Sequence, residues 1–121
     1  MSLIAFVPST DLARARTFYE GVLGLEVVEV TPFALVLRSD GVMVRVTQVP
    51  ELEPRPFTIL GWSTDAIADD VARLAGRGVA FVRYEGMEQD ELGIWTTPGG
   101  DQVAWFADPD GNTLSFTQFS A

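Results

Sequence analysis

One pattern occurs twice in this chain of 121 residues, and it limits the possible folds more than any other feature. The triplet Ser-Thr-Asp stands at 9–11 and again at 63–65, an offset of 54, and Gly24 and Gly78 repeat with the same offset. An apolar run precedes each triplet, and apolar residues at helical spacing follow it. Such self-similarity predicts two modules, each built as a strand, a capped helix and three further strands.

The residues around the two triplets predict where the strands, the helices and the linker lie. The predicted strands are 3–8, 25–30, 33–37 and 42–47 in module one, and 57–62 and 79–82 in module two. Ser9-Thr10-Asp11 and Ser63-Thr64-Asp65 are expected to cap the two helices. The repeated prolines at 50–56 predict a linker, so a single domain is expected with module one at about 1–49 and module two at about 57–121.

A C-terminal hairpin is expected to complete module two. Pro109 presets a negative φ and Gly111 accepts a positive φ, so the chain reverses between the apolar runs on either side of residues 108–112. After the turn, Thr113, Ser115 and Thr117 alternate with apolar residues. This alternation predicts a strand with one face on a core and the other on a wetter surface.

The two modules differ by an insertion. The last strand of module one centres on Arg45 and that of module two on Ser115, an offset of 70, so module two carries about sixteen extra residues. They lie near Tyr84–Gly99 and include acidic residues and Trp95. Two interpretations stay open: a binding or lid loop, or a tolerated surface loop with one packed tryptophan.

Three missing residue types restrict the chemistry. The chain has no His and no Cys, and all eight of its cations are Arg. Nucleophile systems based on Ser-His or Cys-His, lysine Schiff bases and any zinc, copper or haem site that needs His or Cys are therefore excluded. The net charge of −9 argues against a nucleic-acid partner. Since no apolar run reaches the roughly 18 residues of a membrane span and no signal peptide is visible, we expect no membrane partner and a cytoplasmic location.

Two stretches resemble a known family. Residues 7–25 read VPSTDLARARTFYEGVLGL, and residues 106–112 read Phe-Ala-Asp-Pro-Asp-Gly-Asn. They resemble the opening and closing signatures of the vicinal oxygen chelate superfamily, which includes glyoxalase I, extradiol dioxygenases and bleomycin-resistance proteins. The resemblance implies an α+β fold of two βαβββ modules, which form an incomplete and strongly curved barrel-like sheet with a concave cavity. It also implies a homodimer.

The resemblance implies four metal-ligand positions, and this chain departs from the family at each. They fall on Ile4, Arg45, Ile59 (or Thr58 if the register slips by one) and Ser115. An Arg repels a divalent ion, and the aliphatic side chains cannot bind one. We therefore expect a metal-free member without a cofactor, which makes glyoxalase I or dioxygenase activity unexpected. An oxygen-only Mg²⁺ or Ca²⁺ site in the acidic insertion stays open.

The favoured function is metal-independent binding of a small molecule in the cavity, as in drug-sequestering family members. The candidate ligand-binding residues are Phe6, Arg45, Thr47, Ile59, Trp95, Trp105, Ser115 and Thr117. Arg45 would hold an anionic or carbonyl oxygen, whereas the acidic second half would attract a cation, and the sequence leaves this choice open. The alternative is a metal-independent lyase or isomerase in which Asp90 or Glu91 is the base and Arg45 stabilises an oxyanion.

Overall fold

The computed structural model describes all residues from Met1 to Ala121. The chain divides into two compact units. Unit 1 comprises residues 1–54 together with 108–111, and unit 2 comprises residues 55–107 together with 112–121. The main division falls within the predicted linker, and residues 49–57 form neither helix nor strand. No helix is long and apolar enough to cross a membrane.

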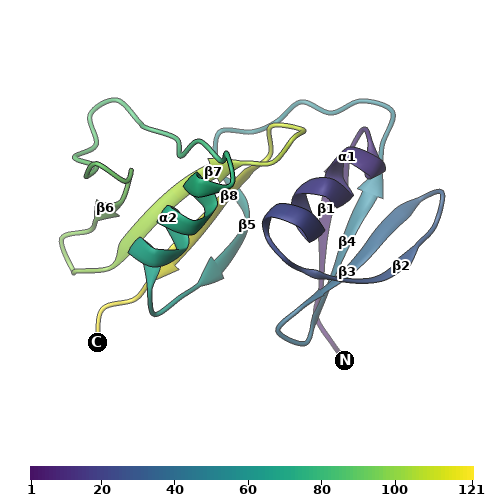
Figure 1. The fold of residues 1–121 in the computed structure, drawn as a ribbon, viewed down its shortest axis with the longest axis horizontal. Helices are drawn as coiled ribbons and strands as arrows, with labels where there is room; N and C mark the ends of the chain where they lie inside the picture. Colours follow the sequence, from purple (N-terminus) through teal and green to yellow (C-terminus); the bar gives the residue numbers. More distant parts are fainter. The chain divides into compact units, whose positions relative to one another are not determined.

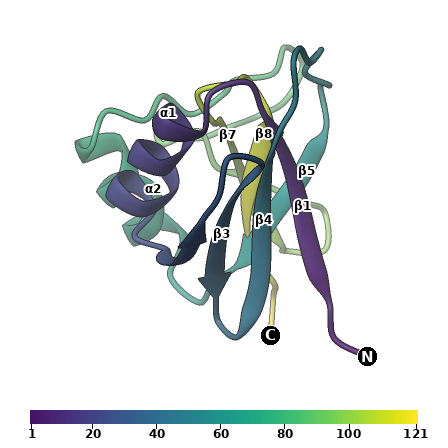
Figure 2. The same cartoon turned by 90° about the vertical axis from the view of Figure 1, so that its right-hand side faces the viewer.

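Unit 1 consists of one four-stranded sheet with a helix against it. Its elements are β1 (Ile4–Ser9), α1 (Leu12–Arg16), the π-helix η1 (Thr17–Val22), β2 (Glu26–Val30), β3 (Ala34–Ser39) and β4 (Val42–Gln48). The strand order is β1-β4-β3-β2, in which β1 runs parallel to β4 and the other pairs are antiparallel. Figure 2 shows β1, β4 and β3 side by side, with α1 on one face. Each strand lies close to its predicted position.

The first helix begins where its cap was predicted. The Asp11 carboxylate accepts a hydrogen bond from the Arg14 backbone N–H at 3.1 Å, which satisfies one of the free donors at the helix start. The helix widens into the π-turn at Thr17, and the Leu23 N–H donates to the Phe18 carbonyl at 2.9 Å. Gly24 then takes a φ of 77°, which ends the helix.

The two faces of β4 differ in burial. Val44 and Val46 are buried on the face that α1 covers. Arg45 and Thr47 lie on the opposite face and are half-buried. A strand alternates its side chains between faces, so the valines form the core of unit 1 and Arg45 faces away from it.

Unit 2 repeats this plan with a shorter fourth strand. Its elements are β5 (Thr58–Ser63), α2 (Ile67–Gly76), β6 (Trp95–Thr96), β7 (Gln102–Ala107) and β8 (Thr113–Gln118). The strand order is β5-β8-β7-β6, the same arrangement as in unit 1. Figure 1 shows α2 lying across β7 and β8. Two four-stranded sheets with one helical segment each confirm the predicted α+β class and the repeat of two modules.

The prediction of a strand at residues 79–82 was wrong. This segment makes only an isolated bridge, between Phe81 and Phe106, and the fourth strand is β6, which lies within the insertion. The reason is the Gln89 side chain, whose amide donates to the Val82 carbonyl at 2.9 Å and accepts from the Tyr84 N–H at 2.7 Å. These backbone groups are therefore bonded to a side chain instead of to a neighbouring strand.

The predicted cap of the second helix was also wrong. The helix begins at Ile67, and its N-cap residue Ala66 has no capping side chain. The Gln118 side chain, at the end of β8, instead accepts a hydrogen bond from the Ile67 N–H at 2.9 Å. The Thr64 hydroxyl accepts from the Ala66 N–H at 3.0 Å and also bonds to Asp70. The start of α2 is thus fixed by a strand that lies fifty residues further along the chain.

The C-terminal hairpin forms around the predicted turn. Ala107 pairs with Thr113, and Trp105 pairs with Ser115. Gly111 has a φ of 86°, as the turn requires. The Asp108 carboxylate accepts from the Asp110 N–H at 2.9 Å, so Asp108 and not Asp110 makes the local side-chain bond that shapes the turn.

The turn residues form a buried polar cluster in unit 1. The Tyr19 hydroxyl donates to the Asp108 carboxylate at 2.7 Å, and both residues are buried. Burial, followed by the charge and hydrogen bond of Asp108, raises the pKa of Tyr19. Asp110 accepts from the backbone and hydroxyl of Thr10 at 2.9 and 2.7 Å and forms a salt bridge with Arg14 at 3.2 Å. The second signature motif therefore has a structural role in this chain.

Candidate ligand-binding site

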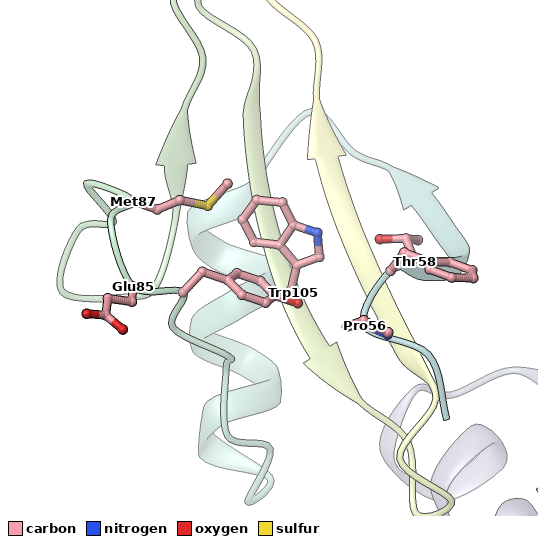
Figure 3. A pocket seen from close by; sticks show the side chains of 7 residues that line it. Pro56, Thr58, Glu85, Met87 and Trp105 are labelled. Carbon is pink, nitrogen blue, oxygen red and sulfur yellow. The ribbon is translucent and has the colours of Figure 1, made fainter. Parts of the chain in front are cut away.

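A cavity of about 390 Å³ lies in unit 2, between the start of β5, the insertion and the middle of β7. Figure 3 shows the Trp105 indole facing it from β7, with Met87 on the insertion side and Thr58 on the β5 side. Seven residues line the cavity: Pro56, Phe57, Thr58, Tyr84, Glu85, Met87 and Trp105. This volume suits a small organic ligand, and most of the lining is apolar or aromatic.

Trp105 is the centre of an aromatic cluster. Tyr84 meets its indole edge to face, with ring centroids 5.2 Å apart and an interplanar angle of 88°. Trp95, on β6, stacks against the same indole at 6.1 Å and 28°. The two residues of the insertion fix the orientation of Trp105, because edge-to-face and offset-stacked contacts between aromatic rings are favourable. Trp62 is separate from this cluster: it is half-buried and stacks against the core residue Phe106.

The β5 side of the site depends on a bulge. The register shifts between Thr58 and Leu60, which leaves Ile59 outside the regular pairing. The Thr58 hydroxyl donates to the Ser115 hydroxyl at 3.2 Å, so Thr58 takes the place beside Ser115 that was assigned to Ile59. A Cβ on Gly61 would lie 3.1 Å from the Ser115 hydroxyl oxygen, and a glycine therefore keeps this hydroxyl pair in place.

The insertion is held by its own hydrogen bonds. Besides its bonds to Val82 and Tyr84, the Gln89 amide donates to the Gly93 carbonyl at 2.8 Å. The Asp90 carboxylate accepts from the N–H groups of Leu92 and Ile94, both at 2.9 Å. These hydrogen bonds hold the loop backbone in a defined conformation, from which the aromatic side chains of the loop extend.

The two candidate bases do not line the cavity. Asp90 is exposed, and one of its carboxylate oxygens is bonded to the two loop N–H groups. Glu91 is exposed as well, and its carbonyl accepts from the Arg83 guanidinium at 2.8 Å. These contacts give Asp90 a structural role in the turn, and no contact of either residue favours the enzymatic alternative.

The candidates of module one lie in unit 1. Phe6 on β1 pairs in register with Arg45 on β4, and Phe6 is 64% exposed. Arg45 is half-buried and forms no salt bridge or side-chain hydrogen bond. Thr47 follows on the same face of β4. Unit 1 therefore presents an unpaired guanidinium beside an exposed aromatic ring.

Within unit 2, the structure brings together some of the predicted residues. Trp105 lines the cavity, Trp95 stacks behind it and Ser115 lies beside the cavity residue Thr58. Thr117 pairs with Val103 two positions further along the hairpin. Five lining residues were not predicted from the sequence: Pro56, Phe57, Tyr84, Glu85 and Met87. The only available signal was their position, at the end of the linker and the start of the insertion.

The residues at the four family metal positions do not fit a metal ion. Ile4 and Ile59 have no ligand atom, Arg45 carries a permanent positive charge, and the hydroxyls of Thr58 and Ser115 are bonded to each other. No group of three or more acidic side chains is placed to hold a metal ion elsewhere.

Known proteins resemble this chain in both sequence and structure. The model of the Glyoxalase/Bleomycin resistance protein/Dioxygenase superfamily matches residues 3–116. A search of curated proteins found no match. Among solved structures, the antibiotic binding protein TnmS3 from Streptomyces sp. CB03234 is similar, with 28% identity, a TM-score of 0.75, and 99% of this chain and 96% of that chain covered.

Two further structures are similar over nearly their whole length. A glyoxalase/bleomycin resistance protein from the same Streptomyces strain has 28% identity and a TM-score of 0.69, and the match covers 98% of this chain and all of the other. A superfamily member from Sphaerobacter thermophilus has 23% identity and a TM-score of 0.75, with 98% and 97% covered. At its lower identity, the Sphaerobacter structure is evidence for the fold alone.

Proposed function

Since the chain belongs to the glyoxalase/bleomycin resistance protein/dioxygenase superfamily, we propose that it is a small-molecule-binding protein whose ligand occupies the cavity of unit 2. The observation that carries this proposal is the lining of that cavity, in which Trp105 and Tyr84 present aromatic surface to a space of about 390 Å³. Aromatic walls of this kind suit a flat, apolar ligand.

The similarity to an antibiotic binding protein supports the same proposal. That protein is 28% identical to this chain over almost its whole length. The carboxylates proposed for the enzymatic alternative lie outside the cavity lining. Binding without turnover is therefore the function that the site favours.

A thermal-shift screen with a panel of planar aromatic compounds tests this proposal. Compounds that bind only the folded state raise the melting temperature in proportion to the logarithm of their concentration. Each hit is then incubated with the protein and followed by mass spectrometry. We expect stabilisation with recovery of unchanged ligand. Chemical conversion of the hit would contradict a pure binding function, and a panel without hits would count against the cavity.

Metal independence is a second part of the proposal. It is supported by the residue types at positions 4, 45, 59 and 115, which do not form a usual ligand set. Elemental analysis of protein purified without chelators measures it directly. We expect no stoichiometric transition metal, and one equivalent of zinc, nickel, iron or manganese would contradict the proposal.

The role of Arg45 is a separate proposal. Its guanidinium is half-buried and unpaired, and a planar donor of this kind suits an anionic or carbonyl oxygen of a ligand. For a ligand that binds unit 1 through an anionic or carbonyl oxygen, Arg45→Met should weaken binding by about 10- to 150-fold, or about 1.5–3 kcal/mol. Unchanged affinity in the folded variant would mean that Arg45 only shapes the surface of unit 1.

A further inference from the structure

Two hydrogen-bond donors of the cavity in unit 2 have no partner. Neither the indole N–H of Trp105 nor the hydroxyl of Tyr84 makes a hydrogen bond, although both residues line the cavity. Figure 3 shows the indole nitrogen directed toward the side formed by Pro56 and Thr58. The Thr58 hydroxyl, in contrast, is engaged with Ser115 at 3.2 Å.

The rest of the lining offers no charge to a ligand. Pro56, Phe57 and Met87 are apolar, and the only charged residue, Glu85, is exposed. Its carboxylate points away from Trp105, toward the outer side of the insertion (Figure 3). A ligand in the cavity therefore meets aromatic and aliphatic surface together with two neutral donors.

A ligand without an acceptor would cover these donors and leave them unsatisfied. A buried N–H or O–H without a partner loses its bond to water and gains nothing in return. A carbonyl oxygen accepts two hydrogen bonds and carries no charge that would have to be desolvated. The lining therefore discriminates between ligands by the presence of an uncharged acceptor.

We infer that the cavity selects an uncharged, planar aromatic ligand with a carbonyl oxygen, which accepts hydrogen bonds from the Trp105 indole N–H and the Tyr84 hydroxyl. This inference rests on the proposed function and specifies its ligand class. Tyr84 and Trp105 line the same cavity with their ring centroids 5.2 Å apart, and the edge-to-face contact between the rings holds the two residues together.

The test compares 1-indanone with indane, which have the same bicyclic carbon skeleton and differ in the carbonyl group. Both are titrated into the ¹⁵N-labelled full chain, and the three tryptophan indole resonances are followed by NMR. The Trp105 resonance is assigned with Trp105→Phe. We expect 1-indanone to bind more tightly than indane by about 2- to 12-fold for each of the two neutral hydrogen bonds that its carbonyl accepts. The Trp105 indole proton should move downfield with the ketone only.

Two substitutions in the protein, each combined with the two ligands, form a double-mutant cycle. Trp105→Phe and Tyr84→Phe each keep an aromatic ring and remove one donor, so each should reduce the ratio of 1-indanone affinity to indane affinity, because any loss of ring contact weakens both compounds alike. Equal affinities for both compounds, with shifts confined to cavity residues, would overturn the inference and leave cavity binding intact. If neither compound shifts the resonance of any cavity residue at millimolar concentration, the inference and the proposed function are both wrong.

Discussion

At the scale of single residues, the clearest interaction is the bond between the Tyr19 hydroxyl and the Asp108 carboxylate. Tyr19 comes from the first helical segment and Asp108 from the turn of the C-terminal hairpin, and both are buried. The two signature stretches of the sequence therefore meet in one polar contact. This contact explains the residue types at positions 19 and 108, so Tyr19 and Asp108 do not require a catalytic role.

Replacing Tyr19 by Phe removes that bond. Tyr19→Phe should lower the free energy of unfolding by about 1–3 kcal/mol, because a buried acceptor loses its partner. Tyr84→Phe is the matched control, because the Tyr84 hydroxyl makes no hydrogen bond. Urea denaturation of both variants measures the difference. Equal effects of the two substitutions would show that the Tyr19 bond contributes nothing.

The second prediction concerns the dependence of stability on pH. Burial alone would raise the pKa of Asp110, but hydrogen bonds from Ser9 and Thr10 and the charge of Arg14 hold it below its usual range. A lowered pKa in the folded state means that this stabilisation is present above the unfolded pKa of about 4 and is lost as the pH falls through the folded value.

Denaturation of wild type and Asp110→Asn at a series of pH values measures this contribution. Wild type should be the more stable at pH 6, and its advantage should shrink below about pH 4. Glu88→Gln is a charge-matched control, because Glu88 is exposed and makes no salt bridge. A difference that stays constant from pH 6 to pH 2.5 would refute the assignment to Asp110.

At the scale of elements, most strands and both helices follow from local sequence. The alternation around Arg45 predicts β4 and its buried valines, and Pro109 with Gly111 predicts the hairpin turn, because period and turn chemistry act over a few residues. The missing strand at 79–82 could not be predicted in this way. It depends on Gln89, whose side chain takes up the backbone groups of two earlier residues.

The candidate site was only partly predictable for the same reason. Trp105 and Ser115 are paired residues of the hairpin, and their register follows from the turn. Tyr84 joins them because the insertion folds back onto β7. This is a long-range contact, which no periodicity in the local sequence encodes.

The prediction at this scale concerns the start of α2. Gln118→Ala should destabilise the protein by about 0.5–2 kcal/mol, because the Ile67 N–H loses its acceptor. Gln102, the residue paired with Gln118 across the hairpin, makes no side-chain hydrogen bond and provides the control. Chemical denaturation of Gln118→Ala and Gln102→Ala compares them. A loss of similar size in Gln102→Ala would indicate a general effect on the hairpin instead of a cap.

At the scale of the whole molecule, we propose that the protein is a homodimer. Strand β1 lies at the edge of its sheet and carries two exposed apolar residues, Ile4 by 41% and Phe6 by 64%, and Leu3, just before the strand, is 75% exposed. A strand edge with exposed apolar side chains is unfavourable in water unless another surface covers it. A second copy of the chain is the cover that the family resemblance implies, and symmetric dimers are the commonest oligomers.

Light scattering coupled to size-exclusion chromatography tests the dimer. We expect a mass of twice the 13.2 kDa chain at micromolar concentration, and a shift toward monomer in Phe6→Ser. Phe33→Ser is the control, because Phe33 is also exposed but lies outside the strands. A wild-type protein that is monomeric throughout this concentration range would contradict the proposal.

The central claim is that the cavity around Trp105 binds the ligand. For the best compound from the thermal-shift screen, calorimetric titration of Trp105→Ala should show a loss of affinity of at least about tenfold, or ~1.4 kcal/mol, since aromatic anchors dominate such sites. Phe119→Ala, which removes an aromatic residue that is 67% exposed and does not line the cavity, should bind like wild type. Undiminished affinity in folded Trp105→Ala would contradict the account.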